Sequence, residues 1–179
     1  MIDRIHVLGA SGSGTTTLAR EIARRFGHAH LDTDDFYWEP TDPPFHRARE
    51  EPERRRLLAA ALDTRPRFVL SGSLVGWGDV FVARFELVVF LWIPHDARMA
   101  RLRARERERY GAAIDPGGAL HAHHREFMDW AASYDTGGMD MRSRARHDAW
   151  LAALALPVLR LEGEMPTDEQ IARIEALEA

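Results

Sequence analysis

Residues 5–17 read Ile5-His6-Val7-Leu8-Gly9-Ala10-Ser11-Gly12-Ser13-Gly14-Thr15-Thr16-Thr17, and this segment is the most informative part of the chain about its fold. Its first part is short, apolar and rich in β-branched residues, which predicts a buried strand that enters a tight turn at Gly9. From Thr15 onward, apolar residues recur at a helical spacing: Leu18, Ile22 and Phe26. Gly27 then stands where a helix C-terminal cap belongs. A strand, a glycine-rich turn and a helix therefore follow one another directly.

The turn matches the phosphate-binding pattern G-x-x-x-x-G-K-[ST] in spacing, with Thr15 in the place of the lysine. The glycines allow backbone N–H groups to turn inward around a phosphate, and the helix N-terminus adds partial positive charge. Thr16 is placed to coordinate a magnesium ion that bridges nucleotide phosphates. We expect residues Gly9 to Thr17 to bind the nucleotide; the alternative is a glycine-rich turn that binds nothing.

The missing lysine leaves two interpretations open. In enzymes with this loop the lysine places a positive charge on the outer phosphates, which a threonine cannot supply. Either an arginine from elsewhere in the chain supplies the charge, or the site binds nucleotide and catalyses slowly or not at all. Every basic residue of this chain is an arginine, so an arginine or a metal ion must provide any fixed positive charge.

Farther along the chain, strand-like and helix-like segments alternate. Short apolar runs predict strands at residues 29–32, 68–70, 87–93 and 157–161. Helical patterns occupy residues 52–62, 95–109, 120–134 and 142–156, and Thr167 with Gln170 forms a capping box that opens a terminal helix. This alternation predicts one doubly wound α/β domain over residues 1–179, with a mainly parallel sheet and a helical lid at about residues 105–146.

Composition excludes several classes of protein. The 179 residues contain no cysteine, which removes disulfides, thiol catalysis and cysteine zinc sites. The net charge of −4 argues against a nucleic-acid binder, and no apolar run is long enough to span a membrane. The first residues show no signal peptide, so we expect a cytoplasmic protein.

Three aspartates follow the predicted strand at residues 29–32. Phosphoryl transfer to an alcohol needs an oriented hydroxyl, a group that accepts its proton and a metal-neutralised phosphate. Asp32 would orient water on magnesium, and Asp34 would hold or deprotonate the acceptor, with Asp35 as its rival. The alternative for such a cluster is an Asx turn and a helix cap.

With these residues in view, the sequence resembles the P-loop kinases of the adenylate kinase and shikimate kinase type. The segment 31–34 is similar to the D-T-D segment of shikimate kinases, and 34–37 to the D-D-F-Y of uridine and related nucleoside kinases. The turn Ser71-Gly72-Ser73 lies where shikimate kinases bind the acceptor. The resemblance implies a kinase that uses ATP and Mg²⁺ and transfers a phosphoryl group to a nucleotide, nucleoside or small hydroxy compound. It also implies a nucleotide base near residues 162–164.

Aromatic and basic residues complete the expected site. Phe36, Tyr37 and Trp38 could form a wall facing Trp77 around the acceptor, although aromatic residues beside a strand end more often pack in the core or at its rim. The arginines at positions 98, 101, 105 and 109 share one helix face, which alone indicates a solvated surface.

By the resemblance, Arg101 and Arg105 reach the ATP phosphates, because they precede the lid loop. Arg142 and Arg146 return from the far side of the lid and could clamp the transferred group together. The histidines at 121, 123 and 124 favour surface or packed roles over a zinc site. The expected partners are a nucleotide and a small-molecule acceptor. The alternative function is a nucleotide-binding module or sensor that retains the phosphate-binding loop and has weak or no kinase activity.

Overall fold

The computed structural model describes residues 2–177 and contains a five-stranded, fully parallel sheet with the strand order β2-β3-β1-β4-β5. The strands are β1 (Arg4–Gly9), β2 (Ala29–Asp32), β3 (Phe68–Ser71), β4 (Leu87–Trp92) and β5 (Val158–Glu162). All five lie where apolar runs predict them, within one or two residues at their ends. The predicted doubly wound α/β fold is confirmed.

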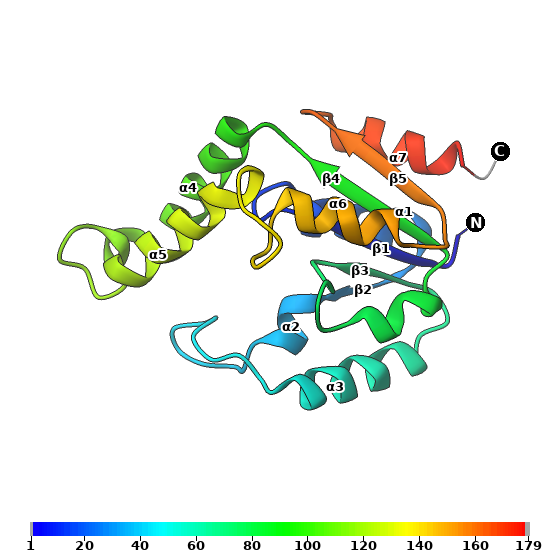
Figure 1. Ribbon diagram of the computed structural model, residues 1–179, viewed down its shortest axis with the longest axis horizontal. Coiled ribbons are helices and arrows are strands. Elements are labelled where there is room, and N and C mark those ends of the chain that lie inside the picture. Colours follow the sequence, from blue (N-terminus) through cyan, green and yellow to red (C-terminus); the bar gives the residue numbers. More distant parts are fainter. Residues whose placement is uncertain (1, 178–179) are drawn as a thin grey trace.

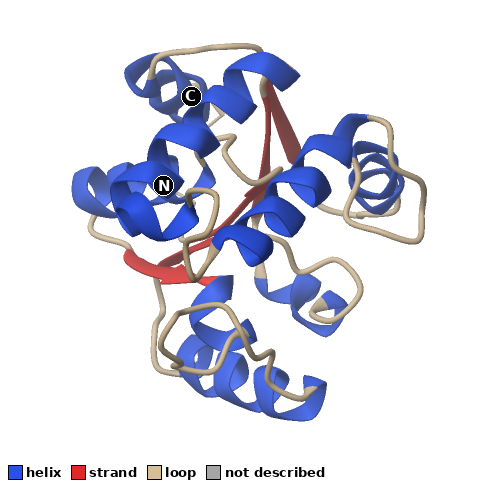
Figure 2. Cartoon of the chain, turned by 90° about the vertical axis from the view of Figure 1, so that its left-hand side faces the viewer, coloured by secondary structure: helices blue, strands red, loops and turns tan. Residues whose placement is uncertain are grey.

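Helices cover both faces of the sheet (Figures 1 and 2). The α-helices are α1 (Thr15–Phe26), α2 (Thr33–Tyr37), α3 (Glu51–Asp63), α4 (His95–Tyr110), α5 (His121–Ala132), α6 (Arg144–Ala152) and α7 (Thr167–Glu175). Short 3₁₀ turns occupy η1 (Asp79–Arg84), η2 (Gly111–Ile114) and η3 (Ser133–Asp135). The hairpin of α4 and α5 projects from the rest of the molecule, at the left of Figure 1. Among residues 2–177, no helix is both long and apolar enough to cross a membrane.

Two layers of apolar side chains hold the helices on the sheet. On one face, strand residues pack against α1 and α7: Ile5, Val7, Val69, Leu87, Val89, Leu91 and Leu161, with Leu18, Ile22, Ile171 and Ile174 from the helices. On the other face, Phe68 and Leu70 contact α3, while Leu8 and Phe90 contact α6. Burial of each of these aliphatic side chains stabilises the fold by about 1.5–3 kcal/mol. The two layers therefore hold the strands, and the loops at their carboxyl ends, in fixed positions.

Two local predictions are wrong. The capping box does not form: Pro166 occupies the N-cap position of α7, Thr167 is already helical, and the Gln170 amide donates to the Met165 carbonyl at 3.0 Å. The helix predicted at 142–156 spans only Arg144–Ala152. It begins at Arg144 because the Ser143 hydroxyl caps it by accepting from the backbone N–H of Arg146 at 3.1 Å. Arg142 therefore lies outside the helix.

Candidate active site

The glycine-rich loop joins β1 to α1 at the carboxyl edge of the sheet. Gly14 is the N-cap of α1 with a φ of 100° and no side-chain capping bond, so the first-turn N–H groups are left for a ligand. Gly12 has a φ of 85°, and a Cβ there would lie 2.8 Å from Leu102 of α4. Left-handed backbone and close packing together require glycine at this position. The loop therefore presents backbone donors, as the pattern predicts.

Ser13 adds an unsatisfied polar group to this loop. Its side chain is only 2% exposed, and its hydroxyl has no hydrogen-bond partner among residues 2–177. A buried hydroxyl without a partner costs about 1–3 kcal/mol. Such an orphaned group fits a loop that is built to receive a polar ligand.

Thr16 and Asp32 come together beside the loop. The Thr16 hydroxyl donates to Asp32 Oδ2 at 2.9 Å, and the Ser71 hydroxyl donates to the same oxygen at 2.8 Å. The pairing of β2 with β3 sets Asp32 opposite Ser71, which explains why these side chains meet. This set of hydroxyl and carboxylate oxygens is the donor chemistry that Mg²⁺ prefers, so the residues fit the metal expected from the sequence.

The Asp-rich segment forms the short helix α2. Asp32 Oδ1 accepts from the backbone N–H of Asp34 at 3.1 Å, so Asp32 also caps this helix. Burial, followed by repulsion from Asp32, raises the pKa values of Asp34 and Asp35 above the ordinary value, and Arg142 opposes the shift at Asp34. A raised pKa makes a carboxylate a better proton acceptor. The helix-cap interpretation is thus confirmed for Asp32, and the catalytic interpretation of Asp34 and Asp35 stays a prediction.

The turn after β3 is tied into the protein by its own side chains. Gly72 has a φ of 98°, and a Cβ there would collide with the Thr33 hydroxyl. The Ser71 hydroxyl, which donates its proton to Asp32, also accepts a hydrogen bond from His30 Nε2–H at 2.9 Å. Ser73 is buried and lies 3.1 Å from His147 Nε2. Both predicted acceptor-side hydroxyls are thus engaged within the protein.

His147 belongs to a buried polar group that sequence reasoning missed. Its Nδ1 lies 2.8 Å from the Tyr134 hydroxyl, so the imidazole links the Ser73 turn to η3, which follows α5. Burial, with smaller contributions from nearby positive charges, lowers the pKa of His147 to about 3. Three elements distant in sequence meet at this neutral side chain, and no local pattern signals that.

The aromatic residues split between the core and its rim. Phe36 and Tyr37 are partly buried, and the Tyr37 ring contacts Trp38 with 4.8 Å between centroids and Trp77 with 6.2 Å. Trp77 is 5% exposed, and its indole N–H donates to the Ser73 carbonyl at 3.1 Å. The expected Tyr37–Trp77 contact exists, and Trp77 makes it from within the core.

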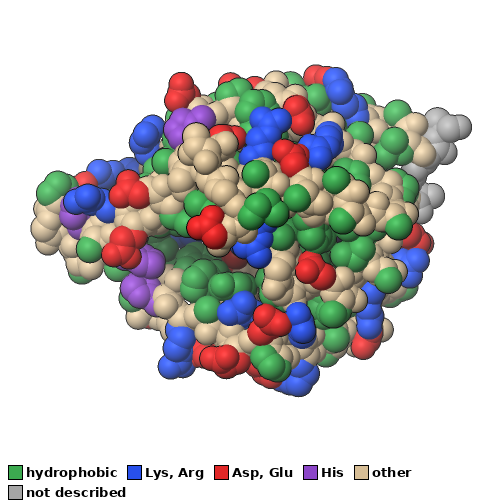
Figure 3. Space-filling view, in the orientation of Figure 1, with side chains coloured by type: hydrophobic (Ala, Val, Ile, Leu, Met, Phe, Trp, Pro, Cys, Tyr) green, Lys and Arg blue, Asp and Glu red, His purple; other side chains and the backbone are tan. Residues whose placement is uncertain are grey.

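A second connection that the sequence did not indicate joins the loop before α3 to the hairpin of α4 and α5. The rings of His46 and His123 stack with 4.3 Å between centroids, and the Arg109 guanidinium lies 5.2 Å from the Phe45 ring centre. The surface is hollowed between the projecting hairpin of α4 and α5 and the layer of α2 and α3 (Figure 3). These ring contacts bridge the two sides of that hollow.

The arginines of α4 do not share one environment. Arg98 is 1% exposed and donates to the Ala131 carbonyl and to Asp135, so the expectation that it shares a solvated face with the others is wrong. Arg101 is exposed and pairs with Glu164 at 3.1 Å. Arg105 is exposed and pairs with its neighbour Glu106 at 2.9 Å.

Arg142 and Arg146 differ from those three. Neither guanidinium has a hydrogen bond or ion pair to another side chain within the described part of the chain. Arg142 lies beside the phosphate loop, in a small recess that it lines together with Ser11, and its guanidinium stands 5.5 Å from the Trp130 ring centre. Arg146 packs on the turn after β3, where a Cβ on Gly76 would lie 2.5 Å from Arg146 Nη2. Arg142 thus lies against the phosphate loop, and Arg146 lies against the segment that follows β3.

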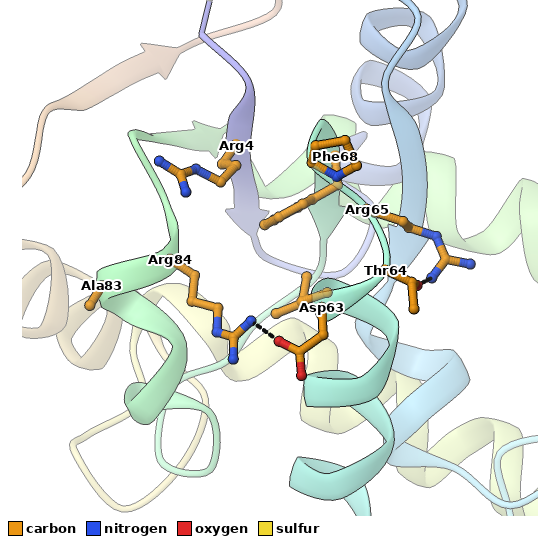
Figure 4. Close-up of a pocket in the computed structure, with 9 residues that line it drawn as sticks. Arg4, Asp63, Thr64, Arg65, Phe68, Ala83 and Arg84 are labelled. Carbon is orange, nitrogen blue, oxygen red and sulfur yellow. Dashed lines mark hydrogen bonds and ion pairs between the residues drawn. The ribbon is translucent and has the colours of Figure 1, made fainter.

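A cavity of about 480 Å³ lies at the opposite end of the sheet, where β1 and β3 begin. Figure 4 shows its ion pair between Arg84 and Asp63. Arg4, also on its lining, pairs with Glu86 at 2.6 Å. Because these cations are already neutralised and far from the phosphate loop, this cavity is not part of the candidate active site.

Comparison with known proteins gives relatives along the whole chain, although no family model matches it. The uncharacterized protein YqaC of Bacillus subtilis is 46% identical over 97% of this chain and 96% of its own length. A cytidylate kinase of Thermococcus sibiricus is 27% identical over 80% of this chain and 76% of its own. The crystal structure of a shikimate kinase from Bacteroides thetaiotaomicron superposes with a TM-score of 0.60 over 100% of both chains at 21% identity, a likeness of fold.

Proposed function

Because this chain belongs to the P-loop kinases of the adenylate kinase and shikimate kinase type, we propose that it transfers the terminal phosphoryl group of ATP to a small-molecule acceptor. The acceptor is a nucleotide, a nucleoside or a small hydroxy compound. The observation that carries the proposal is the contact between Thr16 and Asp32. It sets the metal-type oxygens of the phosphate loop and the carboxylates of the acceptor segment side by side.

The nucleotide phosphates would lie on the N–H groups of residues 9–17, where the dipole of α1 favours negative charge. Thr16 and Asp32 would hold Mg²⁺, which neutralises phosphate charge when it is bound. The nucleotide base would lie near residues 162–164, beside the exposed pair of Arg101 and Glu164. Arg101 and Arg105 would exchange these surface pairs, each worth about 1 kcal/mol or less, for ATP phosphates.

Asp34 would orient the acceptor hydroxyl and take its proton, with Asp35 as the other candidate. A bond forms from the acceptor oxygen to the γ-phosphorus while the bond from that phosphorus to the β,γ-bridging oxygen breaks. ADP leaves, and the acceptor proton passes to the carboxylate. The raised pKa of Asp34 suits this role, because a general base is most effective when its pKa is closer to the pH of the reaction.

The acceptor would lie in the hollow between α2 and the lid, against Tyr37 and the backbone of the Ser71–Ser73 turn. Phe36 and Trp77 would support this wall from the core. Arg146 faces the same space across Gly76. Closure of the lid, about residues 105–146, would exclude water and favour transfer over hydrolysis. We place this reaction in the cytoplasm.

One observation favours a second candidate function. Thr15 removes the positive charge that the loop of a kinase carries, and a protein that binds ATP without transferring phosphate would tolerate that loss. In such a nucleotide sensor the carboxylate of Asp34 has no chemical task. Asp34→Asn therefore separates the two functions.

The first experiment is calorimetric titration of ATP with and without Mg²⁺ into the wild type and Gly14→Val. Valine is strained at a φ of 100°, so we expect binding that needs magnesium in the wild type and is lost in the variant. An acceptor screen then compares Asp34→Asn with Glu175→Gln, a change of an exposed carboxylate on α7. A kinase loses turnover only in Asp34→Asn and keeps ATP binding; a wild type that does not bind ATP contradicts both functions.

A further inference from the structure

The missing lysine of the phosphate loop raises a question that the proposed function leaves open. Phosphoryl transfer concentrates negative charge on the oxygens around the γ-phosphorus, and an enzyme must meet that charge with fixed cations. Thr15 supplies none. The replacement must therefore be an arginine that reaches the phosphate loop and is not already neutralised by a carboxylate of the protein.

Three arginines near the loop fail this requirement. Arg98 packs over Gly12, but its guanidinium is committed to the Ala131 carbonyl and to Asp135. Arg101 and Arg105 are exposed and each pairs with a glutamate. Removing Arg98 from its partners would leave buried groups unpaired, which costs several kcal/mol.

Arg142 meets the requirement. It is partly buried, and burial lowers its pKa, an effect that the negative charge of Asp34 opposes. Partial burial of a guanidinium without an ion-pair partner among residues 2–177 is unfavourable, and an anionic ligand would offset that cost. Asp34 is near enough to attract it, yet the two side chains form no direct ion pair. Arg142 therefore lies between the phosphate loop, at Ser11, and the carboxylate that would hold the acceptor.

We propose that Arg142 is the catalytic cation of this protein, and that its guanidinium binds the γ-phosphate of a nucleoside triphosphate in place of the missing loop lysine. The proposal rests on the proposed function, and it assigns Arg146, which contacts the turn at Gly76, to the acceptor side. A cation reserved for the γ-phosphate also gives the site a preference for ATP over ADP, because ADP lacks that group.

The test combines Arg142→Met with Thr15→Lys. We expect Arg142→Met to weaken Mg-ATP binding by about tenfold to a hundredfold and Mg-ADP binding far less, since a charge-assisted hydrogen bond to phosphate contributes about 1.5–3 kcal/mol. Adding Thr15→Lys to Arg142→Met returns a cation to the loop and should restore the preference for ATP. Arg142→Lys should keep part of it. Calorimetry measures the affinities, thermal unfolding checks that each variant folds, and Arg125→Met, an exposed arginine on α5, is the control.

The outcomes separate this proposal from the proposed function. If Arg142→Met binds ATP and ADP each as tightly as the wild type does, the assignment of Arg142 is overturned. A double variant that folds and binds ATP no better than Arg142→Met would also overturn it, because Arg142 would then act only through the local structure. A preference for ATP that depends on Arg142, in a protein that phosphorylates no acceptor, supports the contact between Arg142 and the γ-phosphate but contradicts both its catalytic role and the kinase function.

Discussion

Acidification should destabilise this protein through two buried histidines, and His6 allows the effect to be isolated. His6 lies on the central strand β1 with no exposed surface, stacked on Phe85 with 5.0 Å between ring centroids. Its Nε2–H donates to the Gly72 carbonyl at 2.8 Å, and Nδ1 has no partner among residues 2–177. Burial lowers the pKa of His6 to about 4, because a proton on Nδ1 would place an unpaired charge in the core.

The sign and size of the effect follow from the difference in protonation between the folded and unfolded chain. Above about pH 6.5 both states hold a neutral imidazole, so His6 contributes no pH dependence. Below that value the imidazole takes up a proton in the unfolded chain but stays neutral in the folded chain. The free energy of unfolding therefore falls until the pH reaches the folded pKa of about 4. At about pH 5 the loss is about 2 kcal/mol for His6 and about the same for His147. Together they remove a large part of a typical 5–15 kcal/mol stability.

Urea unfolding at about pH 7.5 and about pH 5 measures this loss, with tryptophan fluorescence as the signal. His6→Gln keeps a donor for the Gly72 carbonyl and does not titrate, so its loss between the two pH values should be about 2 kcal/mol smaller than that of the wild type. Met139→Gln, a change of an exposed side chain that does not titrate, is the control and should lose as much stability as the wild type does. If His6→Gln and the wild type lose the same stability, the reasoning is refuted.

Three further changes test the framework of the site by thermal unfolding. Gly72→Ala drives a Cβ into the Thr33 hydroxyl at a φ of 98° and should cost about 2–4 kcal/mol; a neutral result would mean that the turn relaxes. Ser73→Ala leaves a buried nitrogen of His147 without its partner and should cost about 1–3 kcal/mol, whereas an unchanged melting temperature would argue against the network. Arg98→Met removes a buried guanidinium from its two acceptors and should cost about 3–5 kcal/mol, well above the effect of changing an exposed arginine.

The fold was predictable because its signals are local. The strand β4 reads as one continuous apolar run, and α1 repeats its apolar residues at helical spacing and ends at Gly27. Helix starts were harder to predict, since the choice of cap depends on neighbouring structure. At α7, Pro166 occupies the N-cap position that the predicted capping box assigns to Thr167. At α6, Ser143 is the N-cap, so the helix begins later than the periodicity suggests.

Part of the candidate site was predictable for a topological reason. Carboxyl ends of parallel strands meet at one edge of the sheet, so Asp32 and Thr16 were expected to be close, and they share a hydrogen bond. The network of His147 with Ser73 and Tyr134 joins segments that no local pattern relates. Whether a given arginine has an ion-pair partner is equally hard to predict from the sequence, because it depends on where the carboxylates lie after folding.

On the proposed assignment, replacing the loop lysine by Arg142 makes the position of the catalytic charge depend on the position of the lid. A lysine at position 15 would be held by α1, next to the phosphates at all times. Arg142 precedes α6, outside any helix, and its guanidinium contacts Trp130 of the lid helix α5. On the proposed assignment, the charge that stabilises transfer is therefore in place only when the lid segment is. Such an enzyme would hydrolyse ATP poorly while the lid is open, so Thr15→Lys should raise ATP hydrolysis in the absence of acceptor more than it raises transfer. A variant that raises neither, while still binding ATP, would show that lid position does not control the cation.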